Sequence, residues 1–474
     1  MSKLIQAPPP QATLRNDLDE CIRLVTGHGE NEAYHMQGFL SQSVLDNKGR
    51  YLHWDDIYHR HHSREVALAH WSLVKFARRT WHMPVFISKT GYILTPNMQR
   101  ITSRVDRQCT EAGIRALFDT YNLTYESLSD FEDEESIASS QLEGAATTRA
   151  VAKKMLQEGR KPHTESEQMI VCNRRLMNIA WERRHDKMTP ELLLLFHQAA
   201  TGGINDAAYH PGIFRTTDDV WVGDDAGNII HQPPAAKELP ALLSMLFQWL
   251  NVHHEDESAW QIYLHPVIKA IIAHFYIGYF HPFYDGNGRV ARALCYWVLF
   301  KSGYSAFRYI SISQLLKEAP REYARAYLRT ETDDMDLTYF IEYQCRIIER
   351  AVNQVTEHLK IAALRHQDLQ TWMMEIGLRK HLSAAQSDLL ASMVYFPTRE
   401  HTIRSVMEKL GISRTTARGI LEQMVNAGVM TKSGGAGNTP AFYKPRRSQE
   451  KFKMGVLAFL RELEKTSGAK GGAR

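Results

Sequence analysis

The chain has 474 residues, of which 44% are hydrophobic and 23% are charged, and its formal net charge is +4. This length predicts about two to four domains, and the composition supports folded cores and excludes a polycation. No window is long and apolar enough to span a membrane, and no N-terminal segment has the pattern of a secretory signal, so no membrane partner is expected. The five cysteines are scattered without CxxC spacing, which predicts reduced thiols in a cytoplasmic protein.

Residues 1–105 form the first predicted region, an N-terminal accessory region with mixed helical and strand patterns. Its clearest element is an amphipathic helix from Val66 to Arg79. Residues 106–360 are predicted to form a mainly helical domain, with Thr164 as the N-cap of its first long helix. The helices of this domain are expected at Glu165–Arg184, Pro190–Ala200, Leu239–Val252, Tyr263–Phe280, Arg289–Lys301 and Leu337–Lys360.

A short helical segment is expected ahead of these helices, around residues 130–145. It contains an acidic run, residues 132–135, which is expected to be solvated, and then the sequence SSQLEG at residues 139–144. Taken alone, Gly144 is typical of a residue that ends a helix.

A β-hairpin is predicted between the helices that end near Ala200 and begin near Leu239. The apolar run Val220–Gly223 precedes the turn residues 224–228, which are typical of a hairpin. An exposed strand edge of this kind could align another chain by strand addition. The alternative is an ordinary surface hairpin.

The stretch from His281 to Arg292 reads HPFYDGNGRVAR and suggests a site for phosphate groups. Gly286 and Gly288 lack a Cβ, so backbone N–H groups can approach an anion closely. The residues after Gly288 read as the start of a helix, and a helix N-terminus favours negative charge.

Charged side chains accompany this turn. Asp285 could bridge a hard cation to phosphate oxygens. Arg289 and Arg292 are three residues apart, so they share one helix face and could direct planar donors at phosphates. His281 lies just ahead of the turn and suits a general base near neutral pH. The alternative is a Gly/Asn turn preceded by a core histidine.

The stretch resembles the signature of the Fic-domain family, HxFx(D/E)GNGRxxR, and meets every specified position. Most characterised Fic proteins transfer AMP from ATP to a Ser, Thr or Tyr hydroxyl of a target protein. The resemblance therefore implies a helical Fic core with a β-hairpin flap, ATP as substrate, Mg²⁺ held by Asp285, and deprotonation of the target hydroxyl by His281. Phe283 would anchor the loop. The implied nucleotide-binding residues are Gly286, Asn287, Gly288, Arg289 and Arg292.

Two further segments resemble parts of the same family. Ser139, Glu143 and Gly144 fit the inhibitory pattern (S/T)xxxE(G/N), which implies that Glu143 pairs with Arg292 and blocks the productive pose of the γ-phosphate. The hairpin resembles the flap that docks the target segment. The implied docking residues are Val220, Trp221, Val222 and Gly223.

The C-terminal part of the chain is predicted to hold a connecting helix at residues 361–383, a small winged-helix-like α/β domain at 384–445 and a basic tail at 446–474. Residues 381–474 contain 15 Lys and Arg and 7 Asp and Glu, so their formal charge is 15 − 7 = +8. The pattern predicts Arg414–Val425 as a recognition helix. The candidate DNA contacts are Arg414, Thr415, Arg418 and Lys432. The alternative is a winged helix that contacts protein or forms a homodimer.

Three functions remain open from the sequence. The leading prediction is an autoinhibited protein adenylyltransferase. The second is a Fic-type enzyme that removes AMP from a modified target or transfers another phosphate-containing group. The third is a DNA-binding regulator whose Fic core senses nucleotide.

Overall fold

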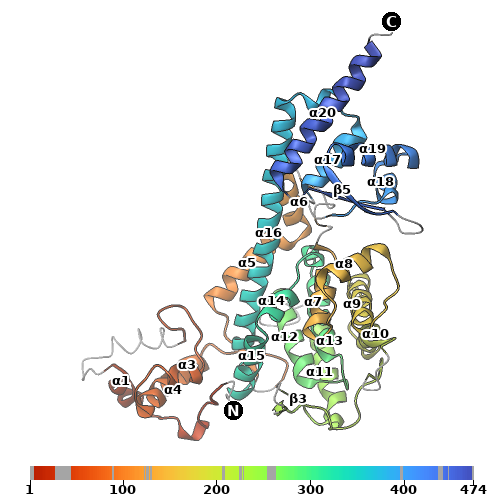
Figure 1. The fold of residues 1–474 in the computed structure, drawn as a ribbon. Coiled ribbons are helices and arrows are strands. Elements are labelled where there is room, and N and C mark those ends of the chain that lie inside the picture. Colours follow the sequence, from red (N-terminus) through yellow and green to blue (C-terminus); the bar gives the residue numbers. More distant parts are fainter. Residues whose placement is uncertain are drawn as a thin grey trace. The chain divides into compact units, whose positions relative to one another are not determined.

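The structure is a computed structural model that describes residues 5–26, 44–87, 90–121, 123, 128, 131–204, 209–223, 227, 229–252, 263–395, 399–435, 441–446 and 448–471. The described chain is mainly helical, as predicted, and its strands form three separate two-stranded antiparallel sheets (Figure 1). It divides into two compact units, residues 1–115 with 131–353 and residues 116–130 with 354–474. Each unit is described separately below.

The first unit begins with an N-terminal region packed on buried tryptophans. Its elements are α1 (Leu18–Thr26), α3 (Trp54–Tyr58), α4 (Arg64–Arg79), β1 (Met83–Pro84), β2 (Gly91–Tyr92) and α5 (Pro96–Cys109). The helix predicted from Val66 is α4, which begins two residues earlier because the Ser63 side chain caps its N-terminus. Trp54 and Trp71 are buried against each other at 6.2 Å between ring centroids.

The helical core of the first unit surrounds two nearly fully buried helices. Its elements are α7 (Glu134–Leu142), α8 (Arg149–Glu158), α9 (Glu165–Glu182), α10 (Pro190–Thr201), β3 (Val222–Gly223), β4 (Ile229–His231), η3 (Ala236–Glu238), α11 (Leu239–Asn251), α12 (Pro266–Phe280), α13 (Asn287–Lys301), η4 (Ser305–Arg308), α14 (Ser313–Glu318) and α15 (Pro320–Thr332). Residues on all sides of α12 and α13 are buried, as expected of helices at the centre of a core. Apart from the last, Leu337–Lys360, the predicted helices are found within a few residues of their expected bounds, and Thr164 caps α9.

One long helix, α16 (Thr338–Glu375), runs past the predicted end at Lys360 without a break, and the division between the two units falls within it. Helix α6 (Glu111–Tyr121) likewise spans a division between the units.

The second unit contains helices followed by a hairpin. Its elements beyond α16 are η5 (Leu378–Lys380), α17 (Ala384–Tyr395), α18 (Ile403–Leu410), α19 (Arg414–Asn426), β5 (Met430–Gly434), β6 (Ala441–Pro445) and α20 (Gln449–Gly471). Gly411 ends α18 with a φ of 62°, and the Ser413 side chain caps α19, so the turn between them forms as the sequence indicates. The winged-helix assignment rests on this order of elements and stays a prediction.

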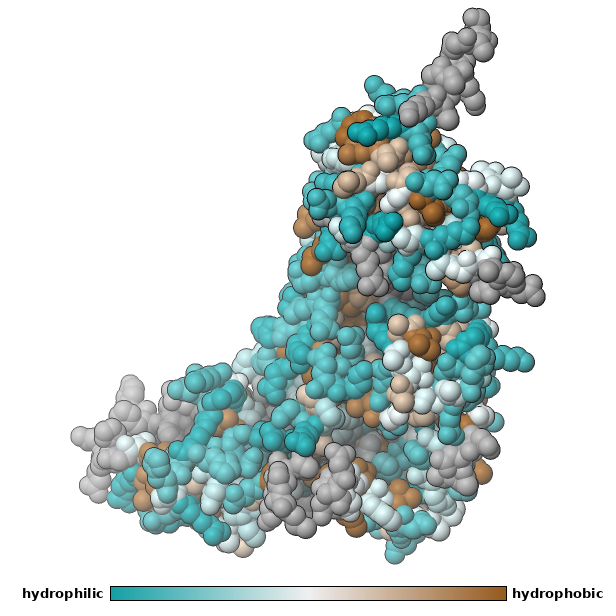
Figure 2. All heavy atoms as spheres, viewed as in Figure 1, coloured by the Kyte–Doolittle hydropathy of each residue, from teal (hydrophilic) through white to brown (hydrophobic). Residues whose placement is uncertain are grey.

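Hydrophilic residues cover most of the visible face of the molecule (Figure 2). Across the described residues, no helix has the length and apolar character needed to cross a membrane. All five cysteines are buried and free of disulfide bonds.

Candidate functional site

The predicted phosphate loop joins the two buried helices α12 and α13. His281 ends α12 in the left-handed conformation, with a φ of 48°, and Gly286 precedes α13 with a φ of 80°. A non-glycine residue with positive φ is uncommon and is held only where its surroundings fix it. The loop between these two turns is therefore closely defined by the core on which it lies.

The imidazole of His281 is oriented to accept a proton on Nε2. Its Nδ1 lies 3.1 Å from the carbonyl oxygen of Gly278, an acceptor, so Nδ1 carries the hydrogen and Nε2 carries the lone pair. Burial lowers the pKa of His281 to about 4, although the Gly278 carbonyl acts in the opposite direction. The ring is therefore neutral near neutral pH, as a general base requires.

Phe283 and Asn287 hold the loop in shape. Both polar atoms of the Asn287 side chain bond to the Phe283 backbone: Oδ1 accepts from its N–H at 2.9 Å, and Nδ2 donates to its carbonyl at 2.8 Å. The Phe283 ring is fully buried and stacks on His197 with ring centroids 3.8 Å apart. The Asn287 side chain, which we expected in the phosphate cradle, is thus engaged in positioning the loop.

His197, on α10, is a site residue that sequence reasoning missed. Its Nδ1 accepts the N–H of Gly212 at 3.0 Å, so its Nε2 carries the hydrogen and donates to the Asp285 carbonyl at 2.8 Å. Burial lowers the pKa of His197 to about 4, which keeps the ring in this neutral form. A histidine on an apolar helix gives no local signal of such a role.

Arg215 is the second residue that the sequence did not reveal. Its buried guanidinium donates through Nε to the His281 carbonyl at 2.8 Å and through Nη2 to the carbonyls of Phe280, at 3.3 Å, and Pro234. Its own N–H donates to the Pro282 carbonyl at 2.9 Å. Arg215 therefore fixes the chain on both sides of the hairpin to the backbone around His281.

Arg289 is placed to bind an anion. Its side chain is 1% exposed, and Nη1 donates to the Ala200 carbonyl at 2.7 Å. Its Nε and Nη2 are buried and have no hydrogen-bond partner among the described residues. Buried polar nitrogens are nearly always satisfied, so two unsatisfied ones on a cation indicate a site for an anionic ligand.

The structure brings Arg292, Ser139 and Glu143 together, as the inhibitory pattern implies. Arg292 Nη2 donates to Glu143 Oε1 at 2.9 Å, and Nε donates to Ser139 Oγ at 2.9 Å. Burial acts to raise the pKa of the Glu143 carboxyl. The positive charges of Arg292 and Arg289 lower it by more, so the pKa lies below its ordinary value. Gly144 follows α7 with a φ of 97°. Glu143 is thus ionised and paired at neutral pH.

The helix that carries Glu143 is anchored by buried acids, which corrects the expectation of a solvated acidic run. Glu134 and Glu135 are 6% and 7% exposed. Glu135 accepts hydrogen bonds from Tyr296 Oη and Ser311 Oγ, each at 2.9 Å. It also accepts from the backbone N–H of Ser313, at 3.0 Å, and from Ser313 Oγ. Burial raises the pKa of the Glu135 carboxyl, against these hydrogen bonds. The run was misread because helical spacing also places some of its members toward the core.

Asp285 presents a single carboxylate in the loop. Its Oδ1 accepts the N–H of Gly286. Burial raises the pKa of this carboxyl, while the Gly286 N–H and Arg289 act to lower it. No cluster of three or more His, Cys, Asp or Glu suited to a metal occurs among the described residues. One carboxylate fits an ion that takes its other ligands from phosphates and water, as Mg²⁺ does.

The predicted hairpin forms from β3 and β4, paired antiparallel with a register irregularity at Val222 and Gly223. Trp221 is 53% exposed and Ile229 is 60% exposed. Three of the predicted turn residues, 224–226, and residue 228 lie outside the described residues. We call residues 220–231 the flap.

The first unit also holds an apolar cavity of about 760 Å³. Phe214, Arg215 and Thr216 line one part of it, and α11 lines another. His281 and Arg289 are not among its lining residues, so this cavity is separate from the anion site.

The candidate DNA contacts lie in the second unit. Arg414, Thr415 and Arg418 are exposed on α19. Lys432 forms an ion pair with Glu422 at 2.5 Å, and Glu422 also accepts from Tyr443 Oη at 3.0 Å. The positive charge of Lys432 is therefore partly compensated within the unit.

Comparisons with known proteins agree with the loop chemistry. Residues 187–299 match the model of the Fic/DOC family. A protein named protein adenylyltransferase Fic from Culex quinquefasciatus is 30% identical over 161 residues, which are 34% of this chain and 29% of that protein. One of the same name from Drosophila melanogaster is 34% identical over 112 residues, or 24% and 20% of the two chains. The chain spans less than a third of the length of these relatives.

Solved structures of Fic-family proteins are also similar. One from Desulfovibrio desulfuricans has 18% identity and a TM-score of 0.47, covering 75% of this chain and 98% of that one. One from Bacteroides thetaiotaomicron has 20% identity and a TM-score of 0.43, covering 56% and 97%. The family match covers α10 to α12 and all but the last two residues of α13, and it includes the complete loop motif.

Proposed function

We propose that this chain is a Fic-type protein adenylyltransferase whose resting state is inhibited by Glu143. The observation that carries the proposal is the pairing of two features at one loop. His281 presents a neutral Nε2 acceptor. Arg289, eight residues later, has two buried guanidinium nitrogens without partners in the described structure. A base and an anion site at this spacing suit transfer of a phosphoryl-containing group to a hydroxyl.

In the proposed reaction, the hydroxyl oxygen of a target Ser, Thr or Tyr attacks the α-phosphorus of ATP. The new bond is the P–O bond to the target, the bond between the α-phosphorus and the bridging oxygen breaks, and pyrophosphate leaves. His281 Nε2 accepts the proton of the attacking hydroxyl. The N–H groups at the start of α13 and the Arg289 guanidinium bind phosphate oxygens, because they offer fixed donors where negative charge lies.

Asp285 would hold Mg²⁺ in this site. When bound, the ion neutralises charge on the phosphates and helps to orient them. Burial raises the pKa of the Asp285 carboxyl, and the negative charge of Glu143 acts in the same direction, against the Gly286 N–H and Arg289. Such a carboxylate gains stability from a divalent cation.

Inhibition follows from the position of the Glu143 carboxylate. It occupies Nη2 of Arg292, which is then unavailable to the γ-phosphate, and it adds negative charge near the site where phosphate binds. ATP that reaches the loop must either displace Glu143 or bind in a pose that does not lead to transfer.

The proposal is tested with ATP labelled on the α-phosphate. Wild type, Glu143→Gly and Glu143→Gly/His281→Ala proteins are incubated with this ATP and Mg²⁺, with and without cell lysate. We expect strong labelling of protein by Glu143→Gly, weak labelling by wild type and none by the double variant. Glu158→Gly, at the end of α8, is the matched control and should behave as wild type.

Absence of label in every sample, with ATP still bound, would contradict AMP transfer. It would favour removal of AMP from a modified target as the second candidate function. The exposure of the Glu143 side chain, 25%, favours that candidate, because a carboxylate accessible to water could position a water molecule for hydrolysis.

DNA binding by the second unit is a separate part of the proposal. It is supported by the exposed cations Arg414 and Arg418 on α19 and by the formal charge of +8 over residues 381–474. The same helix face could instead contact protein or a second copy of the chain. Binding that is sequence-specific and weakens with salt would distinguish DNA from these alternatives.

A further inference from the structure

The inner strand of the flap is held by a buried histidine. His231, on β4, is 8% exposed. Its Nδ1 lies 2.7 Å from Glu331 Oε2 on α15, and its Nε2 lies 2.8 Å from the carbonyl oxygen of Tyr279 on α12. Because both partners are acceptors, each ring nitrogen must donate a hydrogen. His231 is therefore a cation that donates two hydrogen bonds. One of them attaches the flap to Tyr279 on α12, two residues before the catalytic histidine.

Glu331 in turn has a fixed place, because α15 lies close against α12. A Cβ at Gly278 would come within 2.3 Å of Tyr327 Oη, so only glycine permits this approach. One turn earlier on α15, Tyr323 Oη lies 2.7 Å from His274 Nε2. Any displacement of α15 along α12 would therefore move Glu331 and the flap strand attached to it.

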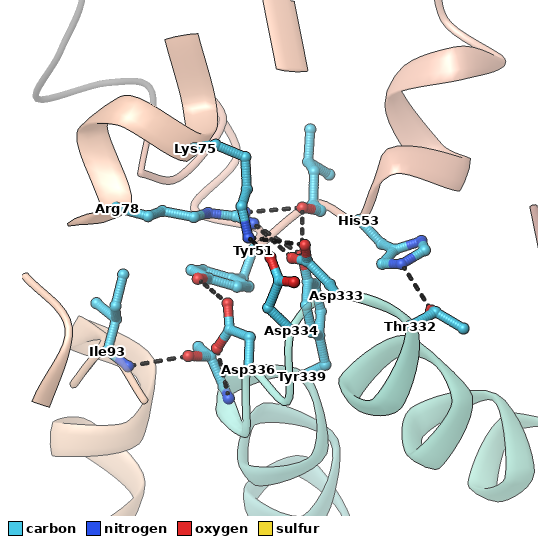
Figure 3. Close-up of polar contacts among 12 residues, drawn as sticks. Tyr51, His53, Lys75, Arg78, Ile93, Thr332, Asp333, Asp334, Asp336 and Tyr339 are labelled. Atoms are coloured by element: carbon cyan, nitrogen blue, oxygen red, sulfur yellow. Dashed lines mark hydrogen bonds and ion pairs between the residues drawn. The ribbon is translucent and has the colours of Figure 1, made fainter. Parts of the chain in front are cut away.

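The C-terminal end of α15 is held by the N-terminal region. Arg329 Nη2 lies 2.7 Å from Asp56 Oδ1. Lys75 Nζ lies 2.8 Å from Asp333 Oδ1, just after the helix (Figure 3). Asp333 Oδ2 accepts from Tyr339 Oη at 2.9 Å. The Arg329–Asp56 and Lys75–Asp333 contacts join residues that are more than 250 positions apart in the sequence.

The same region fixes the turn that follows α15. Arg78 is buried and donates to Tyr339 Oη at 2.7 Å, and its guanidinium carbon lies 3.5 Å from the centre of the Tyr51 ring. Tyr51 Oη donates to Asp336 at 2.6 Å (Figure 3). Asp334 and Met335, between these contacts, both have a φ of 57°. Two consecutive non-glycine residues in this conformation are strained, so the turn depends on the contacts around it.

We propose that residues 44–87 of the N-terminal region set the position of the flap, and that the His231–Glu331 pair couples the flap to the position of α15. His231 and Glu331 are positioning residues, since they act through the flap strand. The proposal rests on the proposed function in one respect, the docking of the target on the flap. Its physical content, the dependence of the flap on Glu331 and Lys75, does not require AMP transfer.

The test is hydrogen exchange of the backbone amides of residues 229–231 in the full chain, at a pH below 6. Glu331→Gln removes the charge but keeps the shape of the side chain. Loss of a charged hydrogen bond should make these amides exchange roughly tenfold faster. Lys75→Met should produce a smaller increase at the same amides. Glu322→Gln, on the same helix but paired only locally with Arg325, is the matched control and should leave them unchanged.

Lys75→Arg keeps the ion pair with Asp333, so its amides should exchange as slowly as those of wild type. Slow exchange in Lys75→Arg and faster exchange in Lys75→Met would separate a specific effect from partial unfolding. Unchanged exchange in Glu331→Gln would overturn the positioning pair, and unchanged exchange in Lys75→Met would overturn the role of the N-terminal region. Hydrogen exchange is independent of activity, so a chain that transfers no AMP would contradict the proposed function and leave this result readable.

Discussion

The carboxylate of Glu143 lies so close to Gly288 that it leaves no room for a Cβ at residue 288. A Cβ at residue 288 would come within 2.3 Å of Glu143 Oε1 and within 3.0 Å of Arg292 Nη1. A glycine at 288 thus permits the Glu143–Arg292 contact, and in the proposed function it also permits the approach of phosphate to the backbone. The absence of a Cβ at residue 288 therefore suits both the state that the structure shows and the proposed active state.

The first prediction follows from this contact. Gly288→Ala should displace Glu143 from Arg292 and yet give no gain in AMP transfer, because the same Cβ obstructs the phosphate site. Glu143→Gly should raise transfer, so the two variants are expected to differ in activity although both break the inhibitory pair. Equal activation by the two variants, measured as label transferred from ATP, would contradict a role for Gly288 in phosphate binding.

The pH dependence of transfer should report the buried state of His281. The neutral ring is the active form, so activity is lost as the pH falls through the pKa of His281. With that pKa at about 4, the acidic limb of kcat/KM should lie well below the ordinary histidine value of 6.5. The measurement is a pH profile of Glu143→Gly, with stability at each pH as control. A limb near pH 6.5 would mean that the ring is solvated in the active state.

Asp285→Ala should reduce Mg²⁺-dependent transfer by about 100-fold or more, the size expected when a group that places charge at the phosphates is lost. Asp285→Asn is the closer control, because it keeps the shape and loses the charge. The readout is the Mg²⁺ concentration needed for half-maximal rate in the Glu143→Gly background. An unaltered Mg²⁺ requirement would rule out Asp285 as its ligand.

Glu135→Ala should destabilise the first unit by about 3 kcal/mol, because it leaves several buried donors without an acceptor. Loosening of α7 should also weaken the Glu143–Arg292 pair and raise basal transfer. Glu132→Ala is the matched control, since Glu132 belongs to the same acidic run and is exposed. Urea unfolding measures the first effect and ATP labelling the second. If Glu135→Ala is as stable as Glu132→Ala, the anchoring role of Glu135 is wrong.

For the second unit, Arg414→Ala and Arg418→Ala should each weaken DNA binding and lower the slope of log affinity against log salt by about one if they contact phosphates. Arg404→Ala is the control, because Arg404 is exposed on the neighbouring helix α18 and pairs with Glu408. Gel-shift titrations at several salt concentrations provide the measurement. Equal effects of all three substitutions would indicate binding by net charge alone.

The sequence predicted the parts of the site whose signal is local. The loop motif depends on residue types at fixed spacing, and helix bounds depend on caps such as Thr164 and on apolar periodicity, so both could be read in advance. The roles of His197, Arg215 and Glu135 could not, because they depend on backbone groups and hydroxyls far along the chain. The role of a polar residue in a core depends on which groups the fold leaves unsatisfied near it, and that is decided only when the helices pack.

The covalent link between α7 and the helices α10 to α13 has a consequence for how the proposed adenylyltransferase would be turned on. A carboxylate attached to the same chain is present at a fixed effective concentration, on the millimolar scale or above for a short tether. Dilution cannot release it, and a competing ligand must exceed that local concentration or bind more tightly. In the proposed mechanism, activity would therefore be gained by a change in α7 itself, such as its displacement by a partner, far more readily than by any change in the amount of this protein.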